Sequence, residues 1–144
     1  GCLDSNTDYY TKEDDNSNEQ DTTTENDWQE FVKDIEQGIE SGEYNIQPFS
    51  RKESNPSIQV SSRTGTGVCF FDSALDGKSK TIIAAYVLDD NEDVKAAGSK
   101  EDMIVHGQYM LQFKANDTKS VTVYAIYDAR VEDTIEIYTR TIHL

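Results

Sequence analysis

A change of hydrophobic period at Gly42 constrains the fold of this chain more than any other sequence feature. Before Gly42, five apolar residues recur at the spacing of one helix face: Trp28, Phe31, Val32, Ile35 and Ile39. Polar and charged residues fill the positions between them, which predicts an amphipathic helix with one face for burial. Asp27 is the expected N-cap, Glu30 is its capping-box partner, and Gly42 is the expected end.

After Gly42, apolar residues alternate with polar ones, and turn-like polar clusters separate the alternating stretches. This pattern predicts seven strands, at Tyr44–Ser50, Ser57–Arg63, Val68–Asp72, Lys80–Leu88, Met103–Lys114, Ser120–Asp128 and Thr134–His143. Polar connections at 116–119 and 130–133 indicate that the last three strands form an antiparallel meander. Within it, one face should carry Val121, Val123, Ala125 and Tyr127.

The predicted fold class is therefore α+β, with the N-terminal amphipathic helix packed on a curved antiparallel sheet of about five to seven strands. Because one helix cannot cover seven strands, the sheet must curl round the helix or close into a β-sandwich or small barrel. In its order of elements the chain resembles cystatin-like domains. The inhibitory motifs of that family are absent, since serines follow Gln59-Val60 and no proline precedes Trp28. The resemblance therefore implies no inhibitory residues.

The first 26 residues differ in composition from the rest of the chain. They contain eight acidic residues and a single lysine, and their only bulky apolar side chains are Leu3, Tyr9 and Tyr10. A segment this polar and this uniformly charged buries too little surface to offset its ordering entropy. We therefore divide the chain into a disordered acidic tether over residues 1–26 and a single helix-plus-sheet domain over residues 27–144.

The chain begins Gly1-Cys2-Leu3-Asp4, and this end resembles that of a bacterial lipoprotein, in which a diacylated cysteine leads a polar tether. The resemblance implies that Cys2 carries lipid. It also implies that the protein is exported and is anchored to the cell membrane or cell surface through Cys2 only. Cys69 would then be a free thiol, and its apolar neighbours predict a small buried hydrophobic residue.

The formal net charge of −15 excludes several partners. Binding to DNA or RNA needs clustered Lys and Arg side chains to neutralise phosphates, so no nucleic-acid partner is expected. The same charge disfavours adsorption to anionic lipid headgroups. No stretch approaches the ~20 apolar residues that a membrane-spanning helix requires.

Asp89, Asn91 and Asp93 place oxygen ligands at alternating positions, as the first three ligand positions of a calcium loop do. Val94 stands where that loop has its turn glycine, and Lys100 stands where it has a bidentate glutamate. The sequence therefore offers two hypotheses for this segment, a Ca²⁺ site at the three residues and an acidic surface loop. No other cofactor is expected.

The remaining chemistry is sparse. His106 and His143 fall on predicted strands without a nearby nucleophile, acid pair or metal-ligand spacing, and His143 should be solvated. The sequence therefore favours a non-catalytic binding or interaction module of the bacterial cell envelope, not an enzyme, with a protein, peptide or glycan as its ligand. Two alternatives stay open: an envelope enzyme that uses carboxylate chemistry, and a calcium-responsive structural module.

Overall fold

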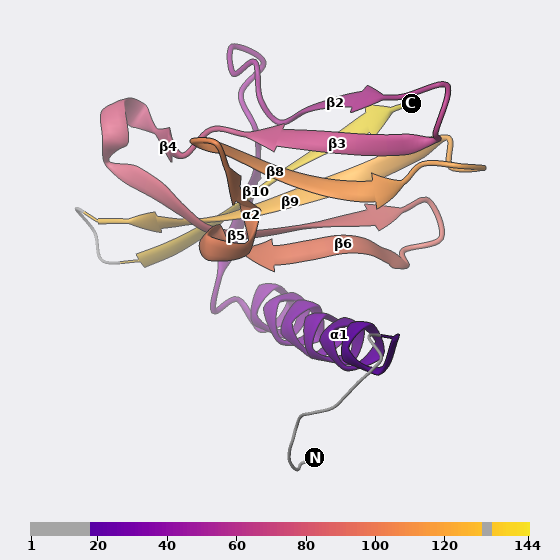
Figure 1. Ribbon diagram of the computed structural model, residues 1–144. Helices are drawn as coiled ribbons and strands as arrows, with labels where there is room; N and C mark the ends of the chain where they lie inside the picture. The colour runs from indigo at the N-terminus through magenta and orange to yellow at the C-terminus, as the bar shows by residue number, and fades with distance from the viewer. Residues whose placement is uncertain (1–17, 131–133) are drawn as a thin grey trace. The chain divides into compact units, whose positions relative to one another are not determined.

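A computed structural model of the 144-residue chain describes the backbone of residues 18–130 and 134–144, and the side chains from Trp28 onward (Figure 1). Cys2 and most of the expected tether therefore lie outside the described residues, as do residues 131–133 of one predicted connection. The chain divides into two compact units, residues 1–34 and residues 35–144. The described strands all belong to the second unit.

Helix α1 (Asn18–Ser41) contains the predicted apolar stripe and ends where the sequence predicts. Gly42 follows the last helical residue with a φ of 85°, a left-handed conformation that glycine adopts without steric cost. The amides of Gly42 and Tyr44 donate to the carbonyls of Ile39 and Gly38. These bonds satisfy two acceptors that the last turn of any helix leaves without an intrahelical partner.

The start of α1 differs from the prediction. The helix begins at Asn18, so Asp27 lies inside it and is not its N-cap. The expected division of the chain between residues 26 and 27 consequently falls within a helix. The physical reason is cooperativity, because once a helix is nucleated each added residue contributes one hydrogen bond for the few torsions that it fixes.

The larger of two sheets has six strands. Its order is β1 (Asn45–Pro48), β10 (Thr134–His143), β9 (Ser120–Ala129) and β5 (Lys80–Asp89), and the far edge of β5 pairs with both β4 (Ala74–Leu75) and β6 (Val94–Ser99). Neighbouring strands are antiparallel except β1, which lies parallel to β10. The sheet is therefore mixed only at this edge.

The smaller sheet has four antiparallel strands, in the order β2 (Ser57–Val60), β3 (Thr66–Phe71), β8 (Gln108–Lys114) and β7 (Ile104–Val105). Two short helices lie in the connections, η1 (Asp76–Lys78) after β4 and α2 (Lys100–Met103) after β6. At the start of α2 the Asp102 carboxylate accepts hydrogen bonds from the Ser99 amide and hydroxyl. This local bonding fixes the turn from β6 into α2.

One apolar core joins the two sheets. The smaller sheet contributes Cys69, Phe71, Leu111 and Phe113, and the larger sheet contributes, among others, the β9 residues Val121, Val123, Ala125 and Tyr127. The four β9 residues confirm the face predicted for that strand. Within residues 35–144 the strands curl into a half-barrel around this core (Figure 1), and the α+β class is confirmed.

The opposite face of the larger sheet is also apolar. The Tyr86 and Tyr124 rings stack there with their centroids 4.8 Å apart and their planes 13° apart, and Ile126 and Ile137 are buried. Burial raises the pKa of the Tyr86 phenol, and the nearby negative charge of Glu36 raises it further. The C-terminal turns of α1 therefore bring charge close to the tyrosine pair.

Two predictions about β-strands are wrong. The segment Met103–Lys114 is not one strand, because Met103 ends α2 and a tight turn at His106-Gly107 separates β7 from β8. The meander is also wrong in part: β9 and β10 form the expected antiparallel hairpin, but β8 belongs to the other sheet. A polar connection shows where a strand ends, and it does not show which strand is paired next.

Strand β6 is absent from the sequence prediction. It contains Ala96, Ala97 and Gly98, residues with little intrinsic preference for strands. Their small size suits the packing, since a Cβ at Gly98 would lie 3.1 Å from the Asp102 Cβ and 3.4 Å from a Leu111 methyl. Tertiary packing, which no local pattern encodes, therefore selects this strand.

The apolar stripe of α1 yields a stability prediction. Ile35 is only 8% exposed, whereas the side chain of Gln37 is exposed. Truncating Ile35 to Ala should lower the free energy of unfolding by about 2 to 5 kcal/mol, the usual range for a buried large aliphatic side chain. Gln37→Ala, measured by the same urea titration, should change it by less than about 0.5 kcal/mol. Equal stability of the two variants would show that Ile35 is not part of the core.

Candidate binding site

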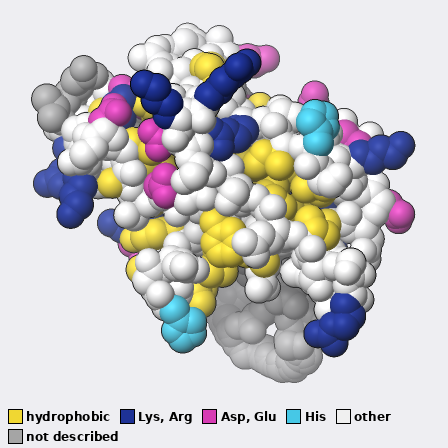
Figure 2. Space-filling view, turned by 90° about the horizontal axis from the view of Figure 1, so that it is seen from above, with side chains coloured by type: hydrophobic (Ala, Val, Ile, Leu, Met, Phe, Trp, Pro, Cys, Tyr) yellow, Lys and Arg dark blue, Asp and Glu magenta, His cyan; other side chains and the backbone are white. Residues whose placement is uncertain are grey.

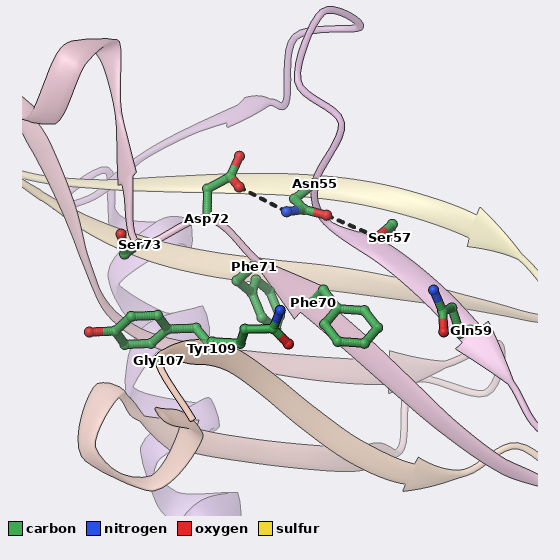
Figure 3. Close-up of a pocket in the computed structure, with 10 residues that line it drawn as sticks. Asn55, Ser57, Gln59, Phe70, Phe71, Asp72, Ser73, Gly107 and Tyr109 are labelled. Carbon is green, nitrogen blue, oxygen red and sulfur yellow. Dashed lines mark hydrogen bonds between the residues drawn. The ribbon is translucent and has the colours of Figure 1, made fainter. Parts of the chain in front are cut away.

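An open pocket of about 560 Å³ lies on the outer side of the smaller sheet (Figure 3). Three segments line it: Asn55 just before β2 with Ser57 and Gln59 on that strand, Phe70 to Ser73 around the end of β3, and Gly107 to Tyr109 at the start of β8. We call it the Asp72 pocket. Figure 2 shows the molecule from above the view of Figure 1, with hydrophobic side chains exposed among backbone and side chains of other kinds.

The strand period explains why these side chains share one face. Successive residues of a strand point to opposite sides of the sheet, and in β3 every second residue is buried. Phe71 is 5% exposed and belongs to the core, so Phe70 points the other way, and Asp72 follows directly after the strand. Ser57 pairs with Phe70 across the β2–β3 ladder, which places the two side chains on the same face of the sheet.

Two hydrogen bonds connect the polar side chains of the pocket. The Asn55 Nδ2 donates to Asp72 Oδ1 at 2.8 Å, and the Ser57 hydroxyl donates to Asn55 Oδ1 at 2.9 Å (Figure 3). These partners fix which end of the Asn55 amide faces the carboxylate. The row Ser57–Asn55–Asp72 is thus oriented by its own bonds.

A residue of the core also holds Asp72, the last member of this row, in position. The hydroxyl of Tyr127, a fully buried residue of β9, donates to the backbone carbonyl of Asp72 at 2.8 Å. Burial raises the pKa of this phenol, so it stays protonated and remains a donor at neutral pH. The position of Asp72 therefore depends on the larger sheet as well as on its own strand.

Arg140 of β10 holds the loop that leads into Asn55. Its guanidinium donates to the carbonyls of Ser50 at 2.8 Å, Glu53 at 3.0 Å and Pro56 at 3.0 Å. It also lies 5.4 Å from the centre of the Phe49 ring, which is buried. One side chain thus ties two carbonyls before Asn55 and one directly after it to the sheet.

The wall at Gly107 is a tight hairpin turn. His106 and Gly107 have φ values of 51° and 79°, as a two-residue turn with both central residues left-handed requires. His106 therefore lies in an exposed turn and not on a strand, which corrects its predicted position. His143 is exposed near the end of β10, as predicted.

The pocket has little charge of its own. Asp72 is the one charged side chain among the ten residues that line it, and the others carry amides, hydroxyls, aromatic rings or no polar side-chain group. Phosphates and carboxylates are normally bound by Arg, Lys or backbone amides at helix N-termini. The lining therefore suits an uncharged polar ligand better than an anionic one.

A second polar cluster lies at a smaller cavity of about 230 Å³ between β1, η1 and β10. The Lys80 Nζ lies 2.9 Å from Glu136 Oε1 and 3.1 Å from Asp76 Oδ2, and it donates to the Tyr138 hydroxyl at 2.6 Å. That hydroxyl in turn donates to Glu136 Oε1 at 2.6 Å, and Gln47 donates to the same oxygen at 3.2 Å. These groups satisfy one another, so we assign the cluster a stabilising role.

The three predicted calcium ligands lie in the hairpin between β5 and β6. Asp89 Oδ1 accepts hydrogen bonds from the amides of Asn91 at 2.9 Å and Asp93 at 2.8 Å. Among the side chains that the structure describes, no group of three or more His, Cys, Asp or Glu is placed to hold a metal ion. The alternating pattern thus has an explanation in turn formation, and the Ca²⁺ site stays a prediction.

The structure describes one of the two cysteines for which the sequence makes a prediction. Cys69 is fully buried in the core, and burial raises the pKa of its thiol, so the prediction of a small buried hydrophobic residue is confirmed. Cys2, the predicted lipidation site, lies outside the described residues.

The residues of the Asp72 pocket are not among the sites that the sequence predicts. A signal was present in the strand period, since Asn55, Ser57 and Gln59 are polar at alternating positions while Pro56 and Ile58 lie between them. A continuous polar face on one strand could have marked an exposed sheet surface. The proximity of this polar face to Asp72 follows only from the β2–β3 register.

Comparison of the chain with protein-family models, with curated proteins and with solved structures finds no match in any of the three. Within the described residues, no helix is both long enough and apolar enough to cross a membrane.

The Lys80 cluster yields a pH prediction. Hydrogen bonds from Tyr138 and Lys80 hold the pKa of Glu136 below its ordinary value of 4.5. A lowered carboxyl pKa adds stability that is present above the unfolded pKa and is lost as the pH falls through the folded pKa. Glu136→Gln should therefore lower the Tm at pH 7, and this deficit should shrink as the pH falls below 4.5. Thermal melts across the pH range would measure it, and a deficit that persists unchanged in acid would contradict the assignment.

Proposed function

We propose that this chain is an exported bacterial lipoprotein of the cell envelope, whose folded domain is a non-catalytic binding module with its ligand in the Asp72 pocket. The observation that carries the proposal is the hydrogen-bonded row of Ser57, Asn55 and Asp72. Its polar groups are positioned before any ligand arrives, so less conformational entropy is lost on binding. The pocket volume of about 560 Å³ lies within the usual range for small-ligand sites.

The composition of the pocket favours binding over catalysis. Carboxylate catalysis of glycoside hydrolysis uses two carboxyl groups on either side of the scissile bond, and the Asp72 pocket is lined by one. Its ten residues include neither a histidine nor a cysteine nor a lysine that could act as nucleophile or general base. We therefore prefer a binding module to the envelope enzyme that the sequence leaves open.

The ligand site can be tested with probes of defined charge. Three kinds of probe would be titrated into the ¹⁵N-labelled chain: neutral oligosaccharides, short uncharged peptides and nucleotides. We expect at least one neutral class to shift the amide resonances of residues 55–59 and 70–73 in a saturable way. Nucleotides should leave these resonances unmoved, because the lining offers their phosphates no cationic side chain.

Other results of the same titration would contradict the proposed ligand site. If neither neutral class moves these resonances, or if the shifts cluster on another surface, the pocket is not the ligand site. Saturable nucleotide binding at the pocket would contradict the charge argument.

The anchor rests on Gly1-Cys2 and on the acidic composition that follows them. Each buried methylene of an acyl chain contributes ~0.8 kcal/mol to membrane binding, and stable anchoring generally takes two lipid signals. A diacylated Cys2 would meet that requirement without basic residues. The strongly acidic segment would then keep the domain away from anionic headgroups.

We expect the protein isolated from its producing cell to carry lipid on Cys2 and to partition with the membrane fraction. Mass spectrometry of the N-terminal peptide would detect the acyl chains. Cys2→Ala should move the protein to the soluble fraction, whereas Cys69→Ala, which changes the buried cysteine, should leave it with the membrane. Membrane association that survives Cys2→Ala would rule out the lipid anchor.

A further inference from the structure

We propose that the Asp72 pocket binds an uncharged sugar residue of a glycan, with Asp72 and Asn55 bonding to neighbouring hydroxyl groups and Phe70 packing against the sugar ring. This inference rests on the proposed function, since it names the ligand class of the same site. It follows from the hydrogen-bonding groups of the pocket that have no partner, from the position of one aromatic ring, and from the distribution of charge.

The carboxylate and the amide offer an acceptor and a donor side by side. Asp72 Oδ1 receives the Asn55 amide, and Asp72 Oδ2 has no hydrogen-bond partner among the described residues. Asn55 Nδ2 carries two N–H groups, one of which is used by Asp72. Adjacent sugar hydroxyls, each of which can donate and accept, match such a pair.

The uncharged side chains around this pair extend the same chemistry. Gln59 and Gln108 are exposed at the pocket, and neither side-chain amide has a hydrogen-bond partner among the described residues. Each amide presents both a donor and an acceptor. Ligands with a single polar end would leave most of these groups unused, whereas a ligand with hydroxyls all round would engage several at once.

Phe70 supplies the apolar part of the site. Its side chain is half-buried and lies within the pocket, between Gln59 and the end of the strand at Asp72 (Figure 3). The face of an aromatic ring carries partial negative charge and attracts polarised C–H groups. One side of a sugar ring presents such C–H groups while its hydroxyls lie round the rim. A sugar stacked on Phe70 would therefore direct its hydroxyls towards the polar row.

Charge separates a neutral sugar from other ligands. The pocket has no Lys or Arg in its lining to bind phosphate, sulfate or carboxylate, and the formal net charge of the chain is −15. Cationic ligands are usually bound by several carboxylates or by an aromatic cage, and this lining has one carboxylate, already bonded to an amide. Neutral glycans meet neither obstacle.

The test uses neutral oligosaccharides of hexose and of N-acetylhexosamine, titrated into the 144-residue chain by calorimetry. We expect saturable binding that Asp72→Asn and Phe70→Ala each weaken by at least about tenfold, because each removes a contact made in the complex. Matched controls are Asp117→Asn, which neutralises an exposed turn residue, and Ile46→Ala, which truncates an exposed residue of the other sheet. Both controls should keep wild-type affinity.

A further variant keeps the test decisive if Asp72→Asn unfolds. The Gln108 side chain is exposed and bonds to no described residue, so Gln108→Ala should fold normally and still weaken sugar binding. If uncharged peptides bind at the pocket and sugars do not, the glycan inference fails and the proposed binding function stands. If no neutral probe binds there, both fail. Equal binding by wild type and all pocket variants would place the sugar elsewhere and overturn the inference.

Discussion

The pairing of β5 with β9 is the constraint on which the rest of this structure depends. Each strand has ten residues, and both faces of the pair are apolar. On the inner face, Ala85, Val87 and Val123 have no solvent exposure, which requires the smaller sheet to cover them. On the outer face, the stacked rings of Tyr86 and Tyr124 also have to be shielded from water. Because a sheet that is apolar on both faces cannot be stable with one face in water, these strands demand a second layer on each side.

The same core positions the candidate site. Because Cys69 and Phe71 lie in the interior, the alternation of β3 directs Phe70 outward. Asp72 follows directly after the strand and bonds there to Asn55. Tyr127 of β9 donates to the carbonyl of Asp72, and Arg140 of β10 binds the loop on both sides of Asn55, at Glu53 and Pro56. The pocket lies on the smaller sheet, but two of its supports come from the larger one. Its geometry is therefore tied to the packing of the two sheets against each other.

Local period accounts for what the sequence could predict. The stripe of α1 and the alternation of β9 and β10 are readable because neighbouring residues alone determine them. The sequence pattern could not predict strand β6, because Ala96, Ala97 and Gly98 are selected by close packing and not by strand preference. The sequence pattern could not predict the Asp72 pocket for a related reason. Asn55 and Asp72 are far apart in the sequence, and only the β2–β3 register brings their side chains together.

The two aspartates, Asp89 and Asp72, show why density of acidic residues is a poor guide to sites in this chain. Asp89 stands in the most acidic cluster of the folded part, yet its carboxylate bonds to two amides of its own turn and serves to fold it. Asp72 has no acidic neighbour in the sequence, but it bonds to one side chain from a distant segment. In the acidic hairpin, turn formation supplies the Asp89 carboxylate with backbone amides as partners. A single carboxylate among amides, hydroxyls and an exposed ring keeps acceptor capacity for a ligand, which is why the pocket and not the acidic loop is the better candidate site.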